Sequence, residues 1–333
     1  MLYIQQYQSE NMRDFMRKFI INSNDSGQRV DKFLTKAVPN LPKGVLYKSI
    51  RLKKIKLNKK RCDISTKLIE GDILELYIND EFFENDTEYK LNFLQASKEL
   101  NIIYEDENIL IINKEIGIAV HNDNDKSTET LINKIKHYLY DKGEYLPQSE
   151  NSFSPAICNR LDKNTCGLVI SAKNAQSLRD MNEIIRNREI HKKYLCLTVS
   201  TPPKNEDTLL AYLHKNNELN KVSISDVAIS GYKEITTKYK ILKNMNILTL
   251  VEIELITGRT HQIRAHMAHI GCCLLGDTKY GIQSVNKKYG VYHQALCAYS
   301  LEFNIKNQCS LSYLNCKSFK LPYEKIWFIK KSF

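Results

Sequence analysis

The sequence predicts an α+β protein, with a small N-terminal unit of two helices and short strands followed by a larger domain built on a mainly antiparallel, mixed β-sheet. Three observations support this fold class. The chain has 333 residues, which is more than one small core usually holds. Beyond about residue 98, strand-like runs outnumber helical ones, and no regular strand–helix–strand repeat indicates a doubly wound fold. The basic residues concentrate in one segment near the N-terminus.

The N-terminal unit is predicted over residues 26–80, after an extension of residues 1–25. Its apolar residues recur at helical spacing in two stretches that a proline-containing turn separates, and short alternating runs follow. The predicted elements are helices over 30–37 and 45–50 and strands over 55–58 and 73–78. Because the pattern is periodic, the segment is predicted to fold and not to be a disordered tail.

The positive charge of the chain is concentrated in one segment of this unit. Residues 28–61 hold twelve Lys or Arg and one acid, a net charge of +11, which equals the formal charge of the whole chain. Such a concentration is typical of an electrostatic docking element for a polyanion, nucleic acid first and an anionic membrane surface second. A solvated basic face without a partner is the alternative. The cations expected to contact RNA are Lys43, Lys48, Arg51, Lys53, Lys54, Lys56, Lys59, Lys60 and Arg61.

Several classes of protein are disfavoured by composition. No apolar run approaches the length of a membrane helix, and the first twenty residues contain no apolar core segment of a secretory signal, so a cytoplasmic protein is expected. The nine cysteines are an odd number without a CxxC motif. They therefore indicate neither a disulfide framework nor a cysteine-rich zinc site.

The second domain is predicted over residues 98–333, after an acidic, non-periodic linker at 81–97. Strands are expected at 102–104, 109–112, 168–170, 194–199 and 248–253, and helices at about 128–140 and 174–188.

Two polar segments of this domain contain candidates for chemistry. Asp162 lies in a loop before a strand, where Arg160 and Lys163 favour its anionic form and make it a candidate nucleophile or base. On spacing alone, an aspartate that caps a turn is the simpler interpretation. Tyr194 opens an apolar strand and could stack on a base or exchange a proton, but on this segment alone an ordinary strand-end aromatic is the simpler interpretation.

A third segment, residues 257–269, is a glycine turn followed by a short helix with three histidines. His266 and His269 are three residues apart, which is compatible with zinc binding. However, the segment has no HExxH pairing and no carboxylate, and its two arginines would repel a cation, so no metal is expected. A serine hydrolase is not supported either, because the chain has no GxSxG motif.

Together, these segments resemble known families. GQRVDKFL, LPKGVLYKSIR, IKLNKKR and LIEGDILEL resemble the small RNA-binding module named after the fourth protein of the small ribosomal subunit. NRLDKNTCGLVISAK, KKYLCLTV and TGRTHQIRAHMAHIGCCLLGDTKYG, in this order, resemble the three signature segments of RluA-type pseudouridine synthases. The second resemblance covers about residues 100–305, and the two-domain layout is similar to members that modify large-subunit ribosomal RNA.

The resemblance implies isomerisation of uridine to pseudouridine without a metal or redox cofactor. It implies that Asp162 starts glycosidic cleavage, that Arg264 pairs with this carboxylate and orients it, and that Tyr194 stacks on the base and is the candidate for removing the C5 proton. Arg160 would fill the space that the extruded uridine leaves. The chemistry requires this extrusion, because a base within a stacked helix cannot expose its glycosidic bond. Arg259, His261 and Gln262 are further substrate-binding candidates. Large-subunit ribosomal RNA is the expected partner and a monomer the simplest state.

Two departures from the family pattern concern substrate fit. Asn159 stands where the family commonly has His, and Cys166 where it commonly has Ser. Neither change removes a catalytic group, so activity should survive. A non-catalytic RNA-binding or ribosome-assembly factor and a synthase acting on tRNA remain the alternatives. A nucleic-acid hydrolase would need paired carboxylates or a nucleophile beside a base, and none stands out.

Overall fold

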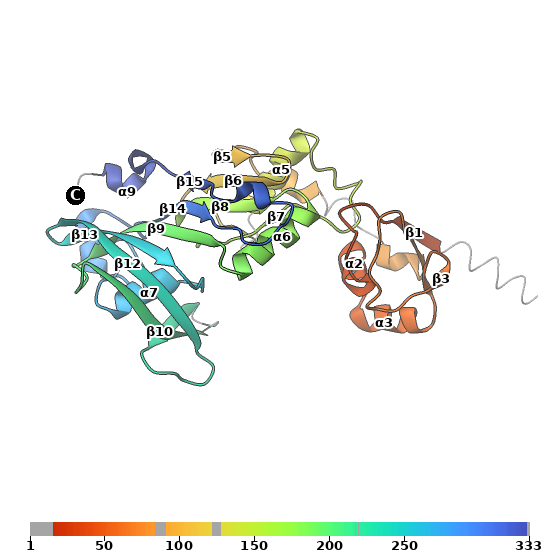
Figure 1. The fold of residues 1–333 in the computed structure, drawn as a ribbon, viewed down its shortest axis with the longest axis horizontal. Coiled ribbons are helices and arrows are strands. Elements are labelled where there is room, and N and C mark those ends of the chain that lie inside the picture. Colours follow the sequence, from red (N-terminus) through yellow and green to blue (C-terminus); the bar gives the residue numbers. More distant parts are fainter. Residues whose placement is uncertain (1–15, 84–90, 122–127, 217, 219, 332–333) are drawn as a thin grey trace, which may run out of the picture. The chain divides into compact units, whose positions relative to one another are not determined.

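The computed structural model describes residues 16–83, 91–121, 128–216, 218 and 220–331 (Figure 1). The chain divides into two compact units. The first contains the described part of Met1–Lys98 together with Asn133–Pro155 and Lys173–Gln176, and the second contains Glu99–Ile132, Ala156–Ala172 and Ser177–Phe333. Residues 133–155 and 173–176, which the sequence assigned to the second domain, thus group with the first unit.

The first unit contains a four-stranded antiparallel sheet in the order β1-β4-β2-β3, together with α2, α3 and most of α5 (Leu131–Asp141). The elements are β1 (Met16–Ile20), α2 (Val30–Ala37), α3 (Lys43–Arg51), β2 (Ile55–Leu57), β3 (Lys60–Arg61) and β4 (Ile73–Tyr77). The helical and strand periodicities predicted α2, α3, β2 and β4. The apolar faces of these elements form one buried core that includes Phe33, Leu34, Leu46 and Leu74. Strand β1 lies before residue 26, within the expected N-terminal extension, whose residues 1–15 are outside the described residues.

The segment expected to be a linker has local structure where it is described. It contains the short 3-10 helices η1 (Asp80–Phe83) and η2 (Asn92–Gln95), while residues 84–90 lie outside the described part. Phe93 is buried, with ring centroids of Tyr140 and Tyr145 each 5.9 Å away. Tyr140 belongs to α5 (Leu131–Asp141). Residues on both sides of the gap at 84–90 therefore pack within the first unit.

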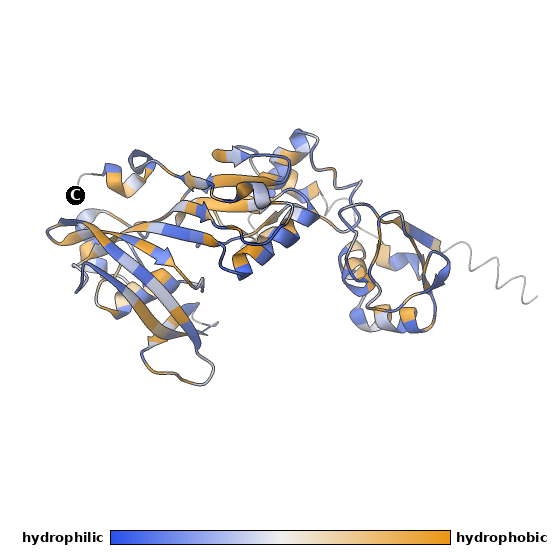
Figure 2. Cartoon of the chain, in the orientation of Figure 1, coloured by the Kyte–Doolittle hydropathy of each residue, from blue (hydrophilic) through white to orange (hydrophobic). Residues whose placement is uncertain are grey.

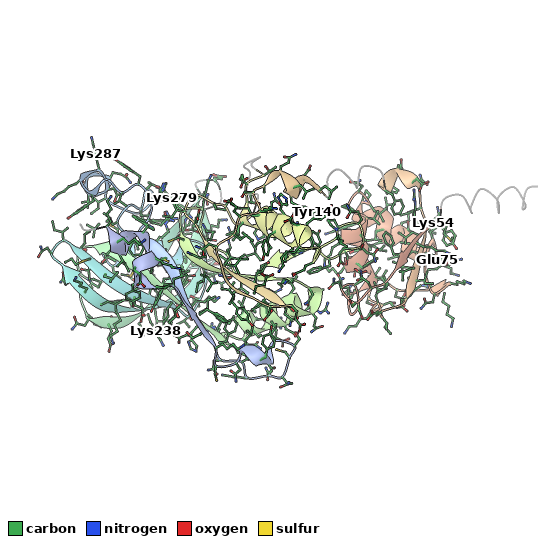
Figure 3. All side chains as sticks on the ribbon, turned by 90° about the horizontal axis from the view of Figure 1, so that it is seen from above. Lys54, Glu75, Tyr140, Lys238, Lys279 and Lys287 are labelled. Carbon is green, nitrogen blue, oxygen red and sulfur yellow. The ribbon has the colours of Figure 1, made fainter. Side chains whose placement is uncertain are left out.

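Polar contacts join residues 20–28 to residues 150–152 within this unit. The fully buried Asp25 carboxylate accepts hydrogen bonds from Asn151 Nδ2 and Ser152 Oγ, both at 2.6 Å. Asn24 Nδ2 donates to Glu150 Oε1 at 2.8 Å. Since Asp25 is buried, these donors are needed to satisfy its charge. Figure 3 shows the side chains of both units, including Lys54 and Glu75 of the N-terminal unit.

The second unit is built on an eleven-stranded sheet in the order β11-β10-β12-β13-β9-β14-β8-β6-β5, with β15 on β14 and β7 on β8. Its strands are β5 (Ile102–Glu105), β6 (Ile109–Lys114), β7 (Ala156–Ile157), β8 (Cys166–Ala172), β9 (Ile190–Val199), β10 (Glu206–Asn216), β11 (Lys221–Ser225), β12 (Lys233–Met245), β13 (Leu248–Leu255), β14 (Leu296–Phe303) and β15 (Ser318–Lys320). The described pairs are antiparallel except β14 with β8. The predicted α+β class with a mainly antiparallel mixed sheet is confirmed.

The central strands of the sheet are almost completely buried. All seven residues of β8 are buried, and β6 is buried apart from Asn113. Figure 2 shows these strands as largely hydrophobic, whereas β10 and β12 alternate between hydrophobic and hydrophilic residues. The helices are α6 (Ala175–Arg186), α7 (Gln262–His269), α8 (Gln283–Tyr289) and α9 (Trp327–Lys330). In the described residues, no helix has both the length and the hydropathy that crossing a membrane would need.

Gly167 sets the spacing between β8 and β14. Its φ of +117° is unfavourable for any other residue, and a Cβ placed there would lie 2.2 Å from the carbonyl oxygen of Ala298. Cys166 and Gly167 pair with Cys297 and Ala298 in the parallel register. The loop of residues 158–165 therefore ends at a fixed position beside β14.

Candidate active site

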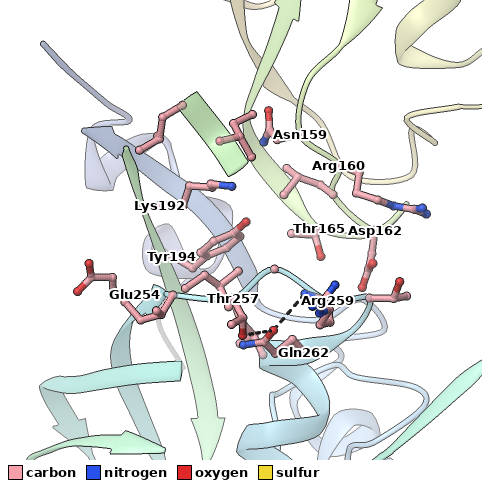
Figure 4. Close-up of a pocket in the computed structure, with 18 of the residues that line it drawn as sticks. Asn159, Arg160, Asp162, Thr165, Lys192, Tyr194, Glu254, Thr257, Arg259 and Gln262 are labelled. Atoms are coloured by element: carbon pink, nitrogen blue, oxygen red, sulfur yellow. Dashed lines mark hydrogen bonds between the residues drawn. The ribbon is translucent and has the colours of Figure 1, made fainter. Parts of the chain in front are cut away.

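A cavity of about 680 Å³ opens between the loop before β8, strand β9 and the start of α7 (Figure 4). All its walls belong to the second unit. Tyr194 from β9 and Asp162 from the loop lie on different walls of this cavity. The polar and charged lining residues relevant to chemistry are Asn159, Arg160, Asp162, Tyr194, Arg259, His261, Gln262 and Arg264. The structure thus brings together every catalytic and substrate-binding candidate of the sequence.

Asp162 is held by a buried guanidinium. Arg264 Nη1 donates a 2.8 Å hydrogen bond to Asp162 Oδ2, and the side chain of Arg264 is only 5% exposed. Asp162 Oδ1 has no partner among the described residues, and the side chain as a whole is 23% exposed. The carboxylate is therefore oriented through one oxygen and leaves the other directed to solvent or substrate.

Arg264 also binds a second carboxylate, which the sequence reasoning did not identify. Asp277 accepts hydrogen bonds from Nε at 2.7 Å and Nη2 at 2.9 Å, so the pair is bidentate. The backbone N–H groups of Lys279 and Tyr280 also donate to Asp277 Oδ1. Burial by itself would raise the pKa of Asp277, but Arg264 and these N–H groups lower it below its usual range. Both carboxylates raise the pKa of Arg264, against the effect of its burial.

His261 is the residue before α7, and its backbone is left-handed, with φ of 54°. Its Nε2 lies 3.8 Å from Asp162 Oδ2, and its Nδ1 lies 2.9 Å from the hydroxyl of Tyr280. Burial lowers the pKa of His261 to about 4; Arg264 and Lys279 act in the same direction and Asp162 opposes them. The imidazole is therefore neutral at pH 7.

Tyr194 is almost fully buried on β9 and faces the cavity. Burial, and then the charge of Asp162, raise the pKa of its phenol. Its hydroxyl therefore keeps its proton at neutral pH, so in the resting site Tyr194 offers an aromatic surface and a hydrogen-bond donor and not a base.

Lys114 holds the loop that carries Asp162 through hydrogen bonds to backbone carbonyl groups. The ammonium of Lys114, 1% exposed, donates to the carbonyl oxygens of Glu115 at 2.8 Å, Ile118 at 2.9 Å and Lys163 at 3.0 Å. Burial lowers the pKa of Lys114 to about 8. Since Lys163 follows Asp162 directly, Lys114 fixes the backbone beside the candidate nucleophile.

The remaining candidates differ in how they are used. Arg160 and Arg259 line the cavity with exposed side chains. Gln262 is buried, and its amide is engaged by protein groups: Nε2 donates to Thr236 O and Thr237 Oγ1, and Oε1 accepts from Thr257 Oγ1 and the N–H of Arg259. Gln262 thus holds the turn that presents Arg259 to the cavity (Figure 4).

The comparisons with known proteins identify the family. A family model described as RNA pseudouridylate synthase matches residues 108–269. A Mycoplasma capricolum protein named as an uncharacterized RNA pseudouridine synthase is 35% identical over 305 residues, which cover 91% of this chain and 96% of that protein. This chain belongs to the RNA pseudouridylate synthase family.

Other relatives agree with this assignment. The ribosomal large subunit pseudouridine synthase C of Rickettsia bellii is 34% identical over 262 residues, covering 76% of this chain and 82% of that protein. The fold matches the solved structure of human RNA pseudouridylate synthase domain containing 4, with a TM-score of 0.54 and 20% identity over 69% of this chain and 90% of the human chain. The RluA-type resemblance is confirmed, and the chain is an RNA-binding isomerase.

The two departures of this synthase from the family pattern lie on β8 and the loop before it. Asn159 Oδ1 accepts the N–H of Ile170 at 2.7 Å and its Nδ2 donates to Leu168 O at 3.3 Å, so Asn159 fastens the loop to the strand. The buried thiol of Cys166 contacts Leu296 O at 3.6 Å. Both side chains make local structural contacts.

The histidines that were weighed as zinc ligands in this synthase have other partners. His266 Nδ1 lies 3.0 Å from Thr237 Oγ1, and His269 Nε2 lies 2.8 Å from Asp226 Oδ1. No group of three or more His, Cys, Asp or Glu side chains with metal-binding geometry occurs in the part of the chain that the structure describes.

The nine cations of the N-terminal unit that are expected to contact RNA lie on α3, on β2 and β3, and on the turns between them. Eight are exposed, and Lys56 is half-buried with its ammonium 4.9 Å from the Tyr77 ring. None of the nine forms an ion pair among the described residues. Lys53 and Lys59 have left-handed backbones, with φ of 61° and 63°. This synthase thus carries an uncompensated positive surface on a folded unit.

Proposed function

We propose that this synthase converts specific uridines of large-subunit ribosomal RNA to pseudouridine, with Asp162 as the group that starts cleavage of the glycosidic bond. Relatives named ribosomal large subunit pseudouridine synthase C support the substrate class. The observation that carries the mechanism is the carboxylate of Asp162 in the cavity, bound through Oδ2 to the buried Arg264 and without a described partner on Oδ1.

The proposed reaction rearranges bonds without gain or loss of atoms. The N1–C1′ bond of the uridine breaks with help from Asp162, the uracil turns within the cavity, C5 bonds to C1′, and the proton on C5 leaves while N1 takes up a proton. The product is an isomer of the substrate, so electrons balance without a redox partner, and we propose that neither metal nor cofactor takes part. Arg264 orients the carboxylate toward the substrate through a charge-assisted hydrogen bond to Oδ2.

The wall opposite Asp162 suits a flat base. A uridine within stacked RNA cannot expose its glycosidic bond, so the base has to leave the stack and enter the cavity. We propose that Tyr194 stacks on the extruded uracil, which its protonated, buried phenol can do without a change of charge. Removal of the C5 proton by Tyr194 would require its phenol to lose a proton first. Arg160 would occupy the space that the uridine leaves.

We propose that the nine cations of the N-terminal unit bind the RNA backbone, since each neutralised phosphate releases counterions and strengthens binding at low salt. Exposure of eight of them, and their lack of ion pairs in the described part of the chain, support this role. The enzyme would then bind RNA through one unit and modify it with the other. We propose a cytoplasmic monomer.

The decisive experiment measures tritium release from C5-tritiated uridine in protein-free ribosomal RNA that lacks the modification. We expect release by the wild type and none by Asp162→Asn, with RNA affinity unchanged within a few-fold. Asp207→Asn, which removes a carboxylate outside the cavity, serves as the matched control and should release tritium at the wild-type rate.

Each outcome of this experiment has a definite meaning. Release by Asp162→Asn would refute the role of Asp162. Release from transfer RNA but not from large-subunit RNA would refute the proposed substrate. Tight binding without release from any RNA would indicate a non-catalytic RNA-binding factor.

A further inference from the structure

The contacts of His261 suggest a function beyond binding substrate. The imidazole lies between Asp162 and Tyr280, with Nε2 3.8 Å from Asp162 Oδ2 and Nδ1 2.9 Å from the Tyr280 hydroxyl. Its side chain is 8% exposed. The left-handed backbone at this position is unfavourable for a residue with a Cβ. A residue held in such a conformation beside reactive groups is a candidate for a functional constraint.

The hydrogen bonds of Tyr280 decide which nitrogen of His261 carries the proton. The Tyr280 oxygen accepts the backbone N–H of Val222, on β11, at 2.9 Å. The hydroxyl proton then has one neighbouring acceptor in the described structure, the Nδ1 atom of His261. If Nδ1 carried the proton, the oxygen of Tyr280 would face two N–H donors and its own proton would have no described acceptor. Both the Val222 N–H and the Tyr280 hydroxyl have an acceptor when Tyr280 donates to Nδ1.

We propose that Tyr280 fixes His261 as the neutral tautomer with its proton on Nε2, and that this N–H is the second donor that holds Asp162 Oδ2, leaving Oδ1 to the substrate. The proposal rests on the proposed role of Asp162. The burial that keeps the imidazole neutral, with a pKa of about 4, agrees with it. The distance of 3.8 Å exceeds a hydrogen bond, and a movement of less than about 1 Å would close it. Such contacts are often long without substrate and shorten when it binds.

His261 and Tyr280 are thus positioning residues that act through Asp162. Arg264, within α7, donates one N–H to Oδ2, and His261, the residue before α7, would donate another. Two donors on the same oxygen would restrict the rotation of the carboxylate more than the single donor from Arg264 does. The strand β11 takes part indirectly, because the Val222 N–H orients the hydroxyl of Tyr280.

The tautomer is measured directly in the full-length protein labelled with ¹⁵N-histidine. Long-range ¹H–¹⁵N spectra distinguish a protonated from a bare ring nitrogen, and His261→Gln assigns the signal among the eight histidines. We expect a bare Nδ1 and a protonated Nε2 in the wild type, and a mixture of the two tautomers in Tyr280→Phe. Tyr232→Phe, which also removes a hydroxyl contact with β11, is the matched control and should leave the His261 signal unchanged. A protonated Nδ1 in the wild type would overturn the proposal.

The contribution to turnover is read from two replacements of His261. The amide nitrogen of Gln reaches about as far as Nε2, whereas that of Asn reaches only as far as Nδ1. We expect single-turnover tritium release within about tenfold of wild type for His261→Gln, and at least tenfold slower release for His261→Asn than for His261→Gln. Stability should follow the opposite order, because Asn tolerates a left-handed backbone better than Gln.

This opposite order separates positioning from folding. If His261→Asn is as active as His261→Gln, the Nε2–H donor is not required and the proposal fails. The spectra need no turnover, so they decide the tautomer even if the wild type releases no tritium. In that case the proposed function fails, while the assignment of the tautomer stands or falls on the spectra.

Discussion

Replacement of Asp277 by asparagine tests whether the buried carboxylate determines how Arg264 binds Asp162. Asp277 is 0% exposed and receives two hydrogen bonds from Arg264 and two from backbone N–H groups. Asparagine has the same shape but offers one acceptor oxygen, and its NH₂ group would face a guanidinium N–H. Breaking a buried ion pair by removing one charge typically costs about 3–5 kcal/mol. Since the oxygen of asparagine can keep some of these contacts, we expect a loss of about 3 kcal/mol.

The stability loss is measurable by urea denaturation followed through the fluorescence of Trp327, the sole tryptophan, which belongs to the second unit. The folded-state pKa of Asp277 is below its unfolded value. Its stabilisation is therefore fully present above the unfolded pKa of about 4 and is lost as the pH falls through the folded pKa. The difference between wild type and Asp277→Asn should be constant near neutral pH and shrink in acid.

Turnover should fall together with stability but for a separate reason. With asparagine at position 277, Nε and Nη2 of Arg264 keep only one acceptor oxygen between them, and the guanidinium can turn to bind both oxygens of Asp162. We expect tritium release at least about tenfold slower under conditions where the variant is fully folded, a barrier increase of about 1.4 kcal/mol. Asp226→Asn, which breaks the exposed pair with His269 at the other end of α7, is the matched control. Unchanged unfolding and unchanged turnover in Asp277→Asn would refute the reasoning.

Three further results are expected. Gly167→Ala should unfold at markedly lower urea, because its Cβ would overlap Ala298 O at 2.2 Å; Gly271→Ala, with φ of +80° and open space, controls for the backbone cost alone. Lys114→Met should lower stability by roughly 3 kcal/mol, since three backbone carbonyls lose their donor, and should slow tritium release without changing RNA affinity in filter binding. Replacing Lys53 and Lys54 together by Gln should reduce the slope of log Kd against log salt by about 1.5–2, whereas Lys306→Gln should leave the slope unchanged.

The controls in these three cases also define failure. Equal stability of the two glycine variants would mean that β8 and β14 can separate at no cost. Wild-type turnover in Lys114→Met would show that the Asp162 loop needs no anchor. An unchanged salt slope in the double lysine variant would remove those two residues from the RNA interface.

Local sequence patterns predicted the elements that have a strong period of their own. The helices α2 and α3 were predicted because their buried residues recur at helical spacing, and the strands β6, β8, β9 and β13 because their apolar residues form short strand-like runs. Strand β1 was missed because its sequence, MRKFI, is short and charged, and it becomes a strand only by pairing with β4. The grouping of residues 133–155 with the first unit depends on long-range contacts such as Asn151 with Asp25, which no local pattern reveals.

The residues of the site were likewise predicted where the sequence carried a signal and missed where their contacts depend on the fold. Asp162, Tyr194 and Arg264 were identified through motif segments whose joint order is specific, although each residue alone had a simpler explanation. Asp277 lay within a quoted segment, GDTKYG, yet nothing in that segment shows that it faces Arg264. Gln262 was expected to bind substrate, and the structure shows its amide engaged with the turn around Thr257. An amide's partners depend on the fold around it and not on its neighbours in the sequence.

The arrangement of one guanidinium between two carboxylates has a chemical consequence. A guanidinium can bind a carboxylate through two N–H groups at once, which would engage both oxygens and neutralise the charge. Here the buried Asp277 occupies Nε and Nη2, so Arg264 offers Asp162 a single N–H from Nη1. The three groups together carry one net negative charge, and the more exposed carboxylate, that of Asp162, keeps one oxygen that no described residue binds. Asp277 thus makes Arg264 orient the proposed nucleophile without blocking it.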